Sequence, residues 1–153
     1  MAQVVICGAK RTPMAGFQGA FSNLTAAQLG GAALGAALSE AGVTHVDDLL
    51  MGNVLSAGQG QAPARQAGFA AGLRQDVPAT TLNKMCGSGM KTTMIGFDQI
   101  ALGQANIVAV GGMESMTNAP YLLPNMRGGA RIGHGQTVDH MFLDGLEDAY
   151  DKG

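Results

Sequence analysis

Short apolar runs alternate along the chain with segments whose apolar residues recur at the spacing of a helix. The apolar, β-branched runs predict strands over residues 3–9, 49–55, 79–85 and 106–110. Helices are expected from a capping box at Thr25 to about Gly42, over residues 63–73, and from just after Cys86 to a stop near Gly103. Strands that alternate with helices predict an α/β layer built on a mostly parallel sheet.

The second segment of the chain has a different character. Residues 119–153 are rich in Gly, Pro, Met and mixed charges, and they contain no long periodic stretch. A length of 153 residues suits one domain, or one domain with the beginning of a second. We therefore expect one domain over residues 1–118 and the start of a loop-rich domain over residues 119–153.

The composition excludes several classes of partner. Apolar residues make up 46% of the chain and charged residues 13%, a balance that suits a chain burying further surface against a partner. A net charge of −2 argues against a nucleic acid or an anionic membrane, which would need clustered Lys and Arg. No signal peptide or membrane-spanning stretch is evident, and the two cysteines are too few for a disulfide framework. A reducing, cytoplasmic setting is the simplest expectation.

Cys86 is the strongest candidate for a catalytic residue. It stands where a predicted strand turns into a predicted helix, at the edge where open α/β sheets collect ligands. A helix N-terminus favours a thiolate, and the small residues Gly87, Ser88 and Gly89 would let a substrate carbonyl approach backbone N–H groups. The alternative is that Cys86 is a small buried hydrophobic residue beside glycines that only permit close packing. Cys7, inside a wholly apolar run, is expected to be structural.

Other motifs carry less chemistry. The run GSGMKT fails as a phosphate-binding loop because Met90 separates Gly89 from Lys91. His45, His134 and His140 have no metal-ligand spacing, so no metal site is expected. Four carboxylates at helical spacing predict a solvated helix face; they are Asp144, Glu147, Asp148 and Asp151. Glu114 directly follows a buried strand, and structural pairing is favoured there over catalysis.

Taken together, these residues resemble the N-terminal part of a thiolase, and the short-chain acetyl-CoA acetyltransferases are the nearest branch. The segment NKMCGSGMK at residues 83–91 is similar to the one that carries this family's acyl-accepting cysteine. Three further stretches agree in order: Arg11-Thr12-Pro13 with Phe17 and Gly19, residues 111–116 (GGMESM), and residues 134–146 from His134-Gly135-Gln136 to Asp144-Gly145-Leu146. The resemblance covers essentially the whole chain.

The resemblance implies an α/β fold with a thiolase-like mixed βα layered sheet, the first of two similar halves, followed by the start of a loop-rich domain. It implies that Cys86 attacks an acyl-CoA and holds the acyl group, with its own backbone N–H in an oxyanion hole. Leu146 falls where the family's loop domain contacts coenzyme A. The implied reaction condenses two acetyl-CoA to acetoacetyl-CoA and CoA, or runs as the reverse thiolysis. Coenzyme A enters only as part of the substrate, and no separate cofactor is expected.

The chain also departs from the family. Thiolases carry later motifs with an Asn-Glu-Ala-Phe segment, a Gly-His-Pro segment and a second cysteine, and none is present here. We therefore expect that the chain needs the C-terminal half of the same enzyme and is inactive alone. The resemblance to the family also implies a homo-oligomer. The alternative is a non-catalytic α/β module that binds an acyl-CoA or another protein. A condensing enzyme of the ketoacyl synthase type is a more distant option.

Overall fold

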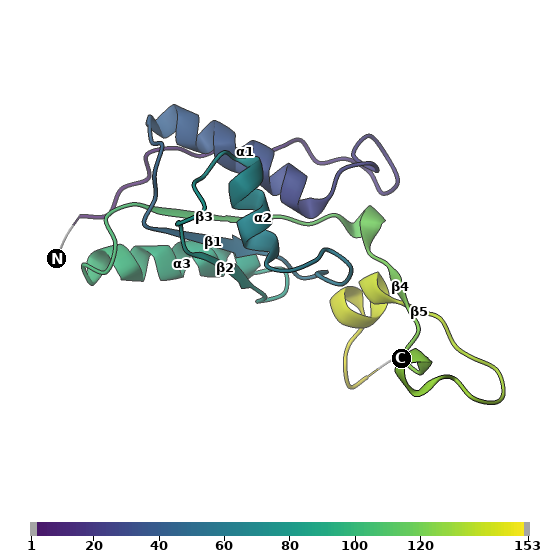
Figure 1. The fold of residues 1–153 in the computed structure, drawn as a ribbon. Helices are drawn as coiled ribbons and strands as arrows, with labels where there is room; N and C mark the ends of the chain where they lie inside the picture. Colours follow the sequence, from purple (N-terminus) through teal and green to yellow (C-terminus); the bar gives the residue numbers. More distant parts are fainter. Residues whose placement is uncertain (1–2, 152–153) are drawn as a thin grey trace.

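A computed structural model describes residues 3–151 of the chain. Its central sheet has three strands in the order β2-β1-β3, and both pairs are parallel. The strands are β1 (Asp48–Gly52), β2 (Ala79–Leu82) and β3 (Val108–Gly112). In Figure 1, helices α1 (Ala26–Ala41) and α2 (Pro63–Ala70) lie on one face of this sheet, and α3 (Ser88–Ala101) lies on the other. The predicted α/β layer with a parallel sheet is confirmed.

The helix boundaries follow their sequence signals. Helix α1 begins at a capping box in which Thr25 and Gln28 bond each other's backbone N–H groups, and it ends at Gly42 with a φ of 65°. Helix α2 starts at Pro63, whose missing N–H costs nothing in the first turn. Strands β1 and β2 are shorter than their apolar runs, and β3 has the expected length but is shifted two residues toward the C-terminus.

The main core lies between the sheet and the pair α1–α2. Leu49 and Met51 of the central strand β1 are almost fully buried and pack with Leu34 of α1 and Ala67 of α2. Helix α3 instead approaches the sheet through small residues one turn apart: Ser88, Thr92 and Gly96 are its buried positions. This close approach brings the start of α3 to the ends of the strands.

The predicted N-terminal strand is wrong. Residues 3–9 belong to neither sheet of the described chain, and Ile6 is 81% exposed. Their backbone runs beside α1, where the Ala9 N–H donates to the Glu40 carboxylate at 2.9 Å in place of a neighbouring strand (Figure 1). Cys7 is exposed, so the expectation that it is a buried structural residue is also wrong.

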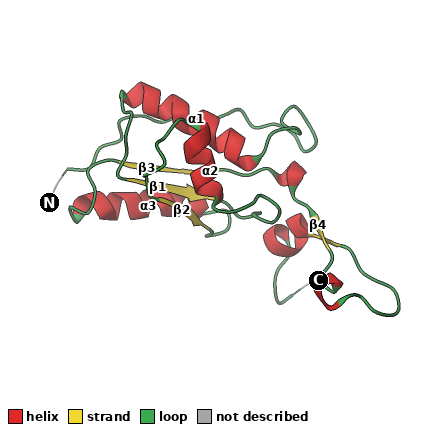
Figure 2. Ribbon diagram, viewed as in Figure 1, coloured by secondary structure: helices red, strands yellow, loops and turns green. Residues whose placement is uncertain are grey.

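Beyond β3 the chain is mostly irregular, as Figure 2 shows. A two-stranded antiparallel ribbon joins β4 (Tyr121–Leu122) to β5 (Val138–Asp139), and a short π-helix, η3, covers Phe142–Leu146. Two further single turns are η1 (Met116–Asn118) and η2 (Met126–Gly128). The four carboxylates Asp144, Glu147, Asp148 and Asp151 are exposed as expected, but the predicted helix face is wrong. The helix η3 ends at Leu146, and Asp148 accepts hydrogen bonds from the N–H groups of Tyr150 and Asp151 in a turn.

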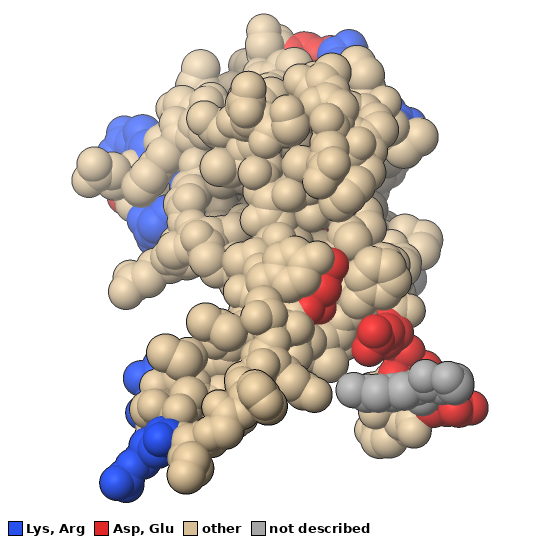
Figure 3. Space-filling model, turned by 90° about the vertical axis from the view of Figure 1, so that its right-hand side faces the viewer, with Lys and Arg blue, Asp and Glu red and all other residues tan. Residues whose placement is uncertain are grey.

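The described surface is sparsely charged. In the face drawn in Figure 3, most of the visible surface is neither basic nor acidic, as the 13% of charged residues leads one to expect. No helix within residues 3–151 combines the length and the hydropathy needed to cross a bilayer.

Candidate active site

A tight turn carries the chain from β2 into α3 and exposes Cys86. The Met85 backbone has a φ of 50°, a left-handed conformation that non-glycine residues adopt rarely. The Ser88 hydroxyl holds this turn by donating to the Met85 carbonyl at 2.6 Å and accepting the Lys84 N–H at 2.9 Å. Cys86 therefore sits one residue before Gly87, the N-cap of α3.

The first turn of α3 packs directly on the carboxyl ends of β1 and β3. A Cβ placed on Gly52, the last residue of β1, would lie 2.5 Å from the Ser88 Cβ. The fully buried Thr92 has its hydroxyl 2.7 Å from the Gly89 carbonyl and 2.9 Å from the Gly111 carbonyl of β3. Small residues and one buried hydroxyl thus fix the helix start against the sheet.

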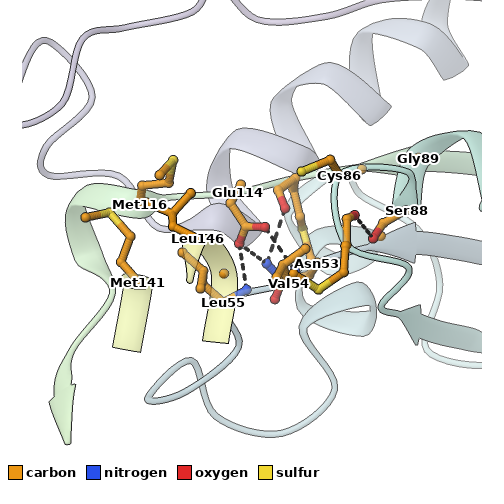
Figure 4. Close-up of a pocket in the computed structure, with 15 residues that line it drawn as sticks. Asn53, Val54, Leu55, Cys86, Ser88, Gly89, Glu114, Met116, Met141 and Leu146 are labelled. Carbon is orange, nitrogen blue, oxygen red and sulfur yellow. Dashed lines mark hydrogen bonds between the residues drawn. The ribbon is translucent and has the colours of Figure 1, made fainter. Parts of the chain in front are cut away.

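A pocket of about 420 Å³ opens at this edge of the sheet. Its walls come from the end of β1 and the loop after it, the turn before α3, the residues after β3, and η3. Figure 4 shows Cys86 on one side of this pocket and Met116, Met141 and Leu146 on the other. Met85 and Met113 also line it, so much of the wall is apolar and made of flexible thioether side chains.

The two residues singled out from the sequence therefore meet in one pocket. Cys86 is exposed and is a free thiol, which contradicts the alternative that it is a small buried hydrophobic residue. Leu146, 54% exposed, lies at the end of η3 and reaches the pocket from the loop-rich segment. The positive end of the α3 dipole lies beside Cys86 and favours an anion. The Gly87 and Ser88 N–H groups are already bonded to the Lys84 and Met85 carbonyls.

The carboxylate of Glu114 is held in the pocket wall by three donors. Its Oε1 accepts from the Asn53 amide at 2.7 Å and from the Leu55 N–H at 3.1 Å, and its Oε2 accepts from the Val54 N–H at 2.9 Å (Figure 4). Asn53, 2% exposed, also donates to the Met113 carbonyl at 3.2 Å. The expectation that Glu114 is paired for structural reasons is confirmed, and its paired oxygens fix the loop after β1.

The histidines divide into two groups. His45 and His134 are outside the pocket, whereas His140 is buried beside η3 and bonds both Asp144 and the Ala57 N–H. Within residues 3–151, no cluster of three or more His, Cys, Asp or Glu side chains has an arrangement that would bind a metal ion.

Sequence reasoning missed Asn53 and Thr92. Asn53 follows directly after β1, and a polar residue at the end of a buried strand is a signal that could have identified it. Thr92 carried no signal, because a threonine in a helix is ordinary until its buried contact with β3 is known.

The structure thus combines a parallel α/β layer with a free cysteine that lines a pocket at the carboxyl edge of the sheet. The model of the thiolase N-terminal domain matches residues 4–153, and the chain belongs to the thiolase family. The resemblance noted from the sequence is therefore confirmed.

Several curated relatives are acetyl-CoA acetyltransferases. The chain is 48% identical over 151 residues to the acetyl-CoA acetyltransferase of Schizosaccharomyces pombe, covering 97% of this chain and 38% of that protein. It is 51% identical over 149 residues to acetyl-CoA acetyltransferase 2 of Arabidopsis thaliana, covering 96% and 37% respectively. A relative from Gibberella zeae named as cytosolic is 48% identical over 151 residues, covering 97% and 38%. The chain thus spans little more than a third of the length of these relatives.

Proposed function

We propose that this chain supplies the acyl-accepting cysteine of an acetyl-CoA acetyltransferase, with Cys86 as the nucleophile. The observation that supports the proposal most is the free Cys86 thiol lining a pocket at the N-terminus of α3 in a member of the thiolase family. The pocket contains no other nucleophile as strong as a thiolate among its lining residues.

The first half-reaction is acyl capture. The Cys86 sulfur attacks the thioester carbonyl of acetyl-CoA, and the developing oxyanion accepts a hydrogen bond from the backbone N–H of Cys86. A bond forms between the Cys86 sulfur and the carbonyl carbon, and the bond to the coenzyme A sulfur breaks. Coenzyme A leaves with the proton that Cys86 released. The products are acetylated Cys86 and free CoA.

The second half-reaction is a Claisen condensation. A base removes a proton from the methyl group of a second acetyl-CoA, and the resulting carbanion attacks the acetyl group on Cys86. A carbon–carbon bond forms, the bond to the Cys86 sulfur breaks, and acetoacetyl-CoA results. Thiolysis is the reverse sequence. Glu114 is the only other ionisable residue that lines the pocket, and its oxygens are occupied by three donors.

We therefore propose that the proton-transfer groups come from the C-terminal half of the same enzyme, and that this chain alone does not turn over. Leu146 is proposed to contact coenzyme A, which enters only as part of the substrate and without a separate cofactor. Residues 1–118 are proposed to form the N-terminal half-domain, and residues 119–153 the beginning of the loop domain.

A cytoplasmic homo-oligomer is also proposed. Size-exclusion chromatography with light scattering tests the oligomeric state, and cell fractionation tests the localisation.

The central test is acetylation of Cys86. The full-length polypeptide that contains this chain is mixed with acetyl-CoA, quenched rapidly in acid, and measured by intact mass spectrometry. One acetyl group is expected on the wild type and on Cys7→Ala, which removes the other exposed cysteine. Cys86→Ala is expected to carry none. An adduct that persists in Cys86→Ala would overturn the assignment.

A non-catalytic module that binds an acyl-CoA is the second candidate, and the lack of an unoccupied base among the lining residues favours it for this chain alone. The same experiment separates the two. Binding of acetyl-CoA by calorimetry without any covalent adduct, in the full-length polypeptide, supports the module. Rapid adduct formation followed by release of acetoacetyl-CoA supports the enzyme.

A further inference from the structure

His140 occupies an exceptional position in the loop-rich segment. Among the described residues 119–151 it is the only buried one, and its side chain is 7% exposed. Segments normally anchor themselves through apolar side chains, because a buried polar group is costly unless it is hydrogen-bonded. This segment is anchored by an imidazole instead.

Both ring nitrogens of His140 have partners, and these partners define its tautomer. The Ala57 N–H donates to Nε2 at 3.3 Å, so Nε2 carries a lone pair rather than a proton. Nδ1 then carries the proton and donates to the Asp144 carboxylate at 2.5 Å. The His140 backbone N–H donates to the Pro120 carbonyl at 3.2 Å. Both ring nitrogens are therefore engaged, Nδ1 by an acceptor and Nε2 by a donor.

These contacts join two walls of the pocket. Ala57 belongs to the loop after β1, whose residues Val54 and Leu55 line the pocket. Met141 and Leu146, from the segment that begins at His140, line the side opposite Cys86 (Figure 4). The Leu55 side chain also packs against Gly145, where an added Cβ would lie 3.0 Å from Leu55 Cδ2.

We propose that His140 is a positioning residue that, in its neutral tautomer, docks the wall carrying Met141 and Leu146 onto the loop at Ala57. The Nε2 lone pair is the acceptor of the Ala57 N–H, so a side chain without an acceptor at this place loses the link. Other charged groups do not replace this acceptor. Asp144 stays bonded to Nδ1, Asp139 of β5 accepts the Met141 N–H, and Glu114 is bonded to residues 53–55.

Two substitutions separate the two ring contacts. His140→Gln keeps a neutral carbonyl oxygen that can reach the Ala57 N–H. His140→Asn has a shorter amide that keeps a donor for Asp144 but leaves Ala57 without an acceptor. His45→Gln is the control, because it removes an exposed histidine outside the pocket. Hydrogen exchange of the Ala57 amide in the full-length polypeptide is the primary measurement.

The expected result is a protection factor for Ala57 that falls about threefold to tenfold in His140→Asn, the equivalent of losing one neutral hydrogen bond. His140→Gln and His45→Gln should match the wild type at pH 7.5. The Val54 and Leu55 amides, bonded to Glu114, provide internal references. Equal protection of the Ala57 amide in the Asn and Gln variants would overturn the proposal.

The consequence for catalysis rests on the proposed function. If the docked wall contacts the coenzyme A portion of the substrate, His140→Asn should raise KM for acetyl-CoA about threefold to tenfold while kcat changes less than about twofold. If the wild-type enzyme transfers no acetyl group but Ala57 protection falls in His140→Asn as expected, the proposed function alone is refuted. If the wild-type enzyme transfers acetyl groups but Ala57 protection is unchanged in His140→Asn, the role of His140 alone is refuted.

Discussion

The Glu114 carboxylate holds one wall of the pocket in place through its hydrogen bonds. Both oxygens accept hydrogen bonds, and every donor comes from three consecutive residues after β1. A carboxylate suits this place because it is purely an acceptor. A neutral amide of the same shape does not, because its NH₂ group must face at least one backbone N–H.

We accordingly expect Glu114→Gln to destabilise the protein by about 1–3 kcal/mol, the cost of leaving a donor unsatisfied. Urea unfolding at pH 7 measures this change. Glu147→Gln is the control, since Glu147 is an exposed carboxylate that follows η3. Equal stability of the wild type and Glu114→Gln would show that the three hydrogen bonds contribute nothing net.

The contact between Gly52 and Ser88 leads to a second prediction. A Cβ at Gly52 would lie 2.5 Å from the Ser88 Cβ and 2.9 Å from its carbonyl carbon, so α3 must move away from β1. Gly52→Ala should cost about 1–3 kcal/mol in unfolding free energy and slow acetylation of Cys86. Gly16→Ala is the control, because nothing lies within 4 Å of a Cβ there. Wild-type acetylation in Gly52→Ala would mean that the start of α3 tolerates displacement.

The sequence made Cys86 recognisable because a cysteine followed by small residues at a strand-to-helix turn has a local signature. The roles of Thr92 and His140 had no such local signature. Each depends on a partner distant in sequence: Thr92 bonds Gly111, and His140 bonds Ala57. Such pairs are defined by the packing of separate elements, which residue spacing does not encode.

The start of β1 is linked to the start of β3 through a carboxylate. Asp47, just before β1, accepts the N–H groups of Asn106 and Ile107 at 2.7 and 3.0 Å. The Asn106 and Ile107 backbone hydrogen bonds hold the pKa of Asp47 below its usual value. Because these bonds favour the charged form, the folded state is favoured most when Asp47 is ionised.

Asp47 should therefore stabilise the fold above about pH 4, near the ordinary pKa of an aspartate, and lose this effect as pH falls through its lower folded-state value. Asp47→Asn should be less stable than the wild type at pH 7, and the gap should narrow as pH falls from about 4 to 2. Thermal melts across this range measure it. Glu147→Gln, an exposed carboxylate outside the sheet, serves as control. A gap that widens on acidification would contradict the assigned direction.

Helix and strand types were predictable where local signals were complete, as at the Thr25 capping box and at Pro63 of α2. The run at residues 3–9 shows the limit of such signals. Its apolar, β-branched sequence is typical of a buried strand. Within the described chain, however, the Ala9 N–H donates to Glu40 of α1, and Ile6 is 81% exposed. A strand requires a neighbour to pair with, and sequence periodicity does not say whether one is available.

Helix α3 has one face buried against the sheet and one face exposed to solvent. Ser88, Thr92 and Gly96 face the sheet, whereas Met90, Met94 and Phe97 are 72%, 58% and 55% exposed. The latter three residues follow one another at four and three positions, so they form one apolar stripe. An exposed stripe of this kind is a surface for association. It is also consistent with the proposed second half of the enzyme packing on this side of the sheet.

The 153-residue chain by itself should therefore self-associate through α3. Static light scattering of the purified chain is expected to give a mass above that of the monomer, rising with concentration. Met94→Glu and Phe97→Glu together should lower this mass, because two carboxylates in the stripe would have to be buried on association. The double variant Leu123→Glu with Met126→Glu changes two similarly exposed apolar residues in the loop-rich segment and is the matched control. A wild-type chain that stays monomeric at every concentration would show that the stripe is not a contact surface, and equal effects of the two double variants would show that association is not specific to α3.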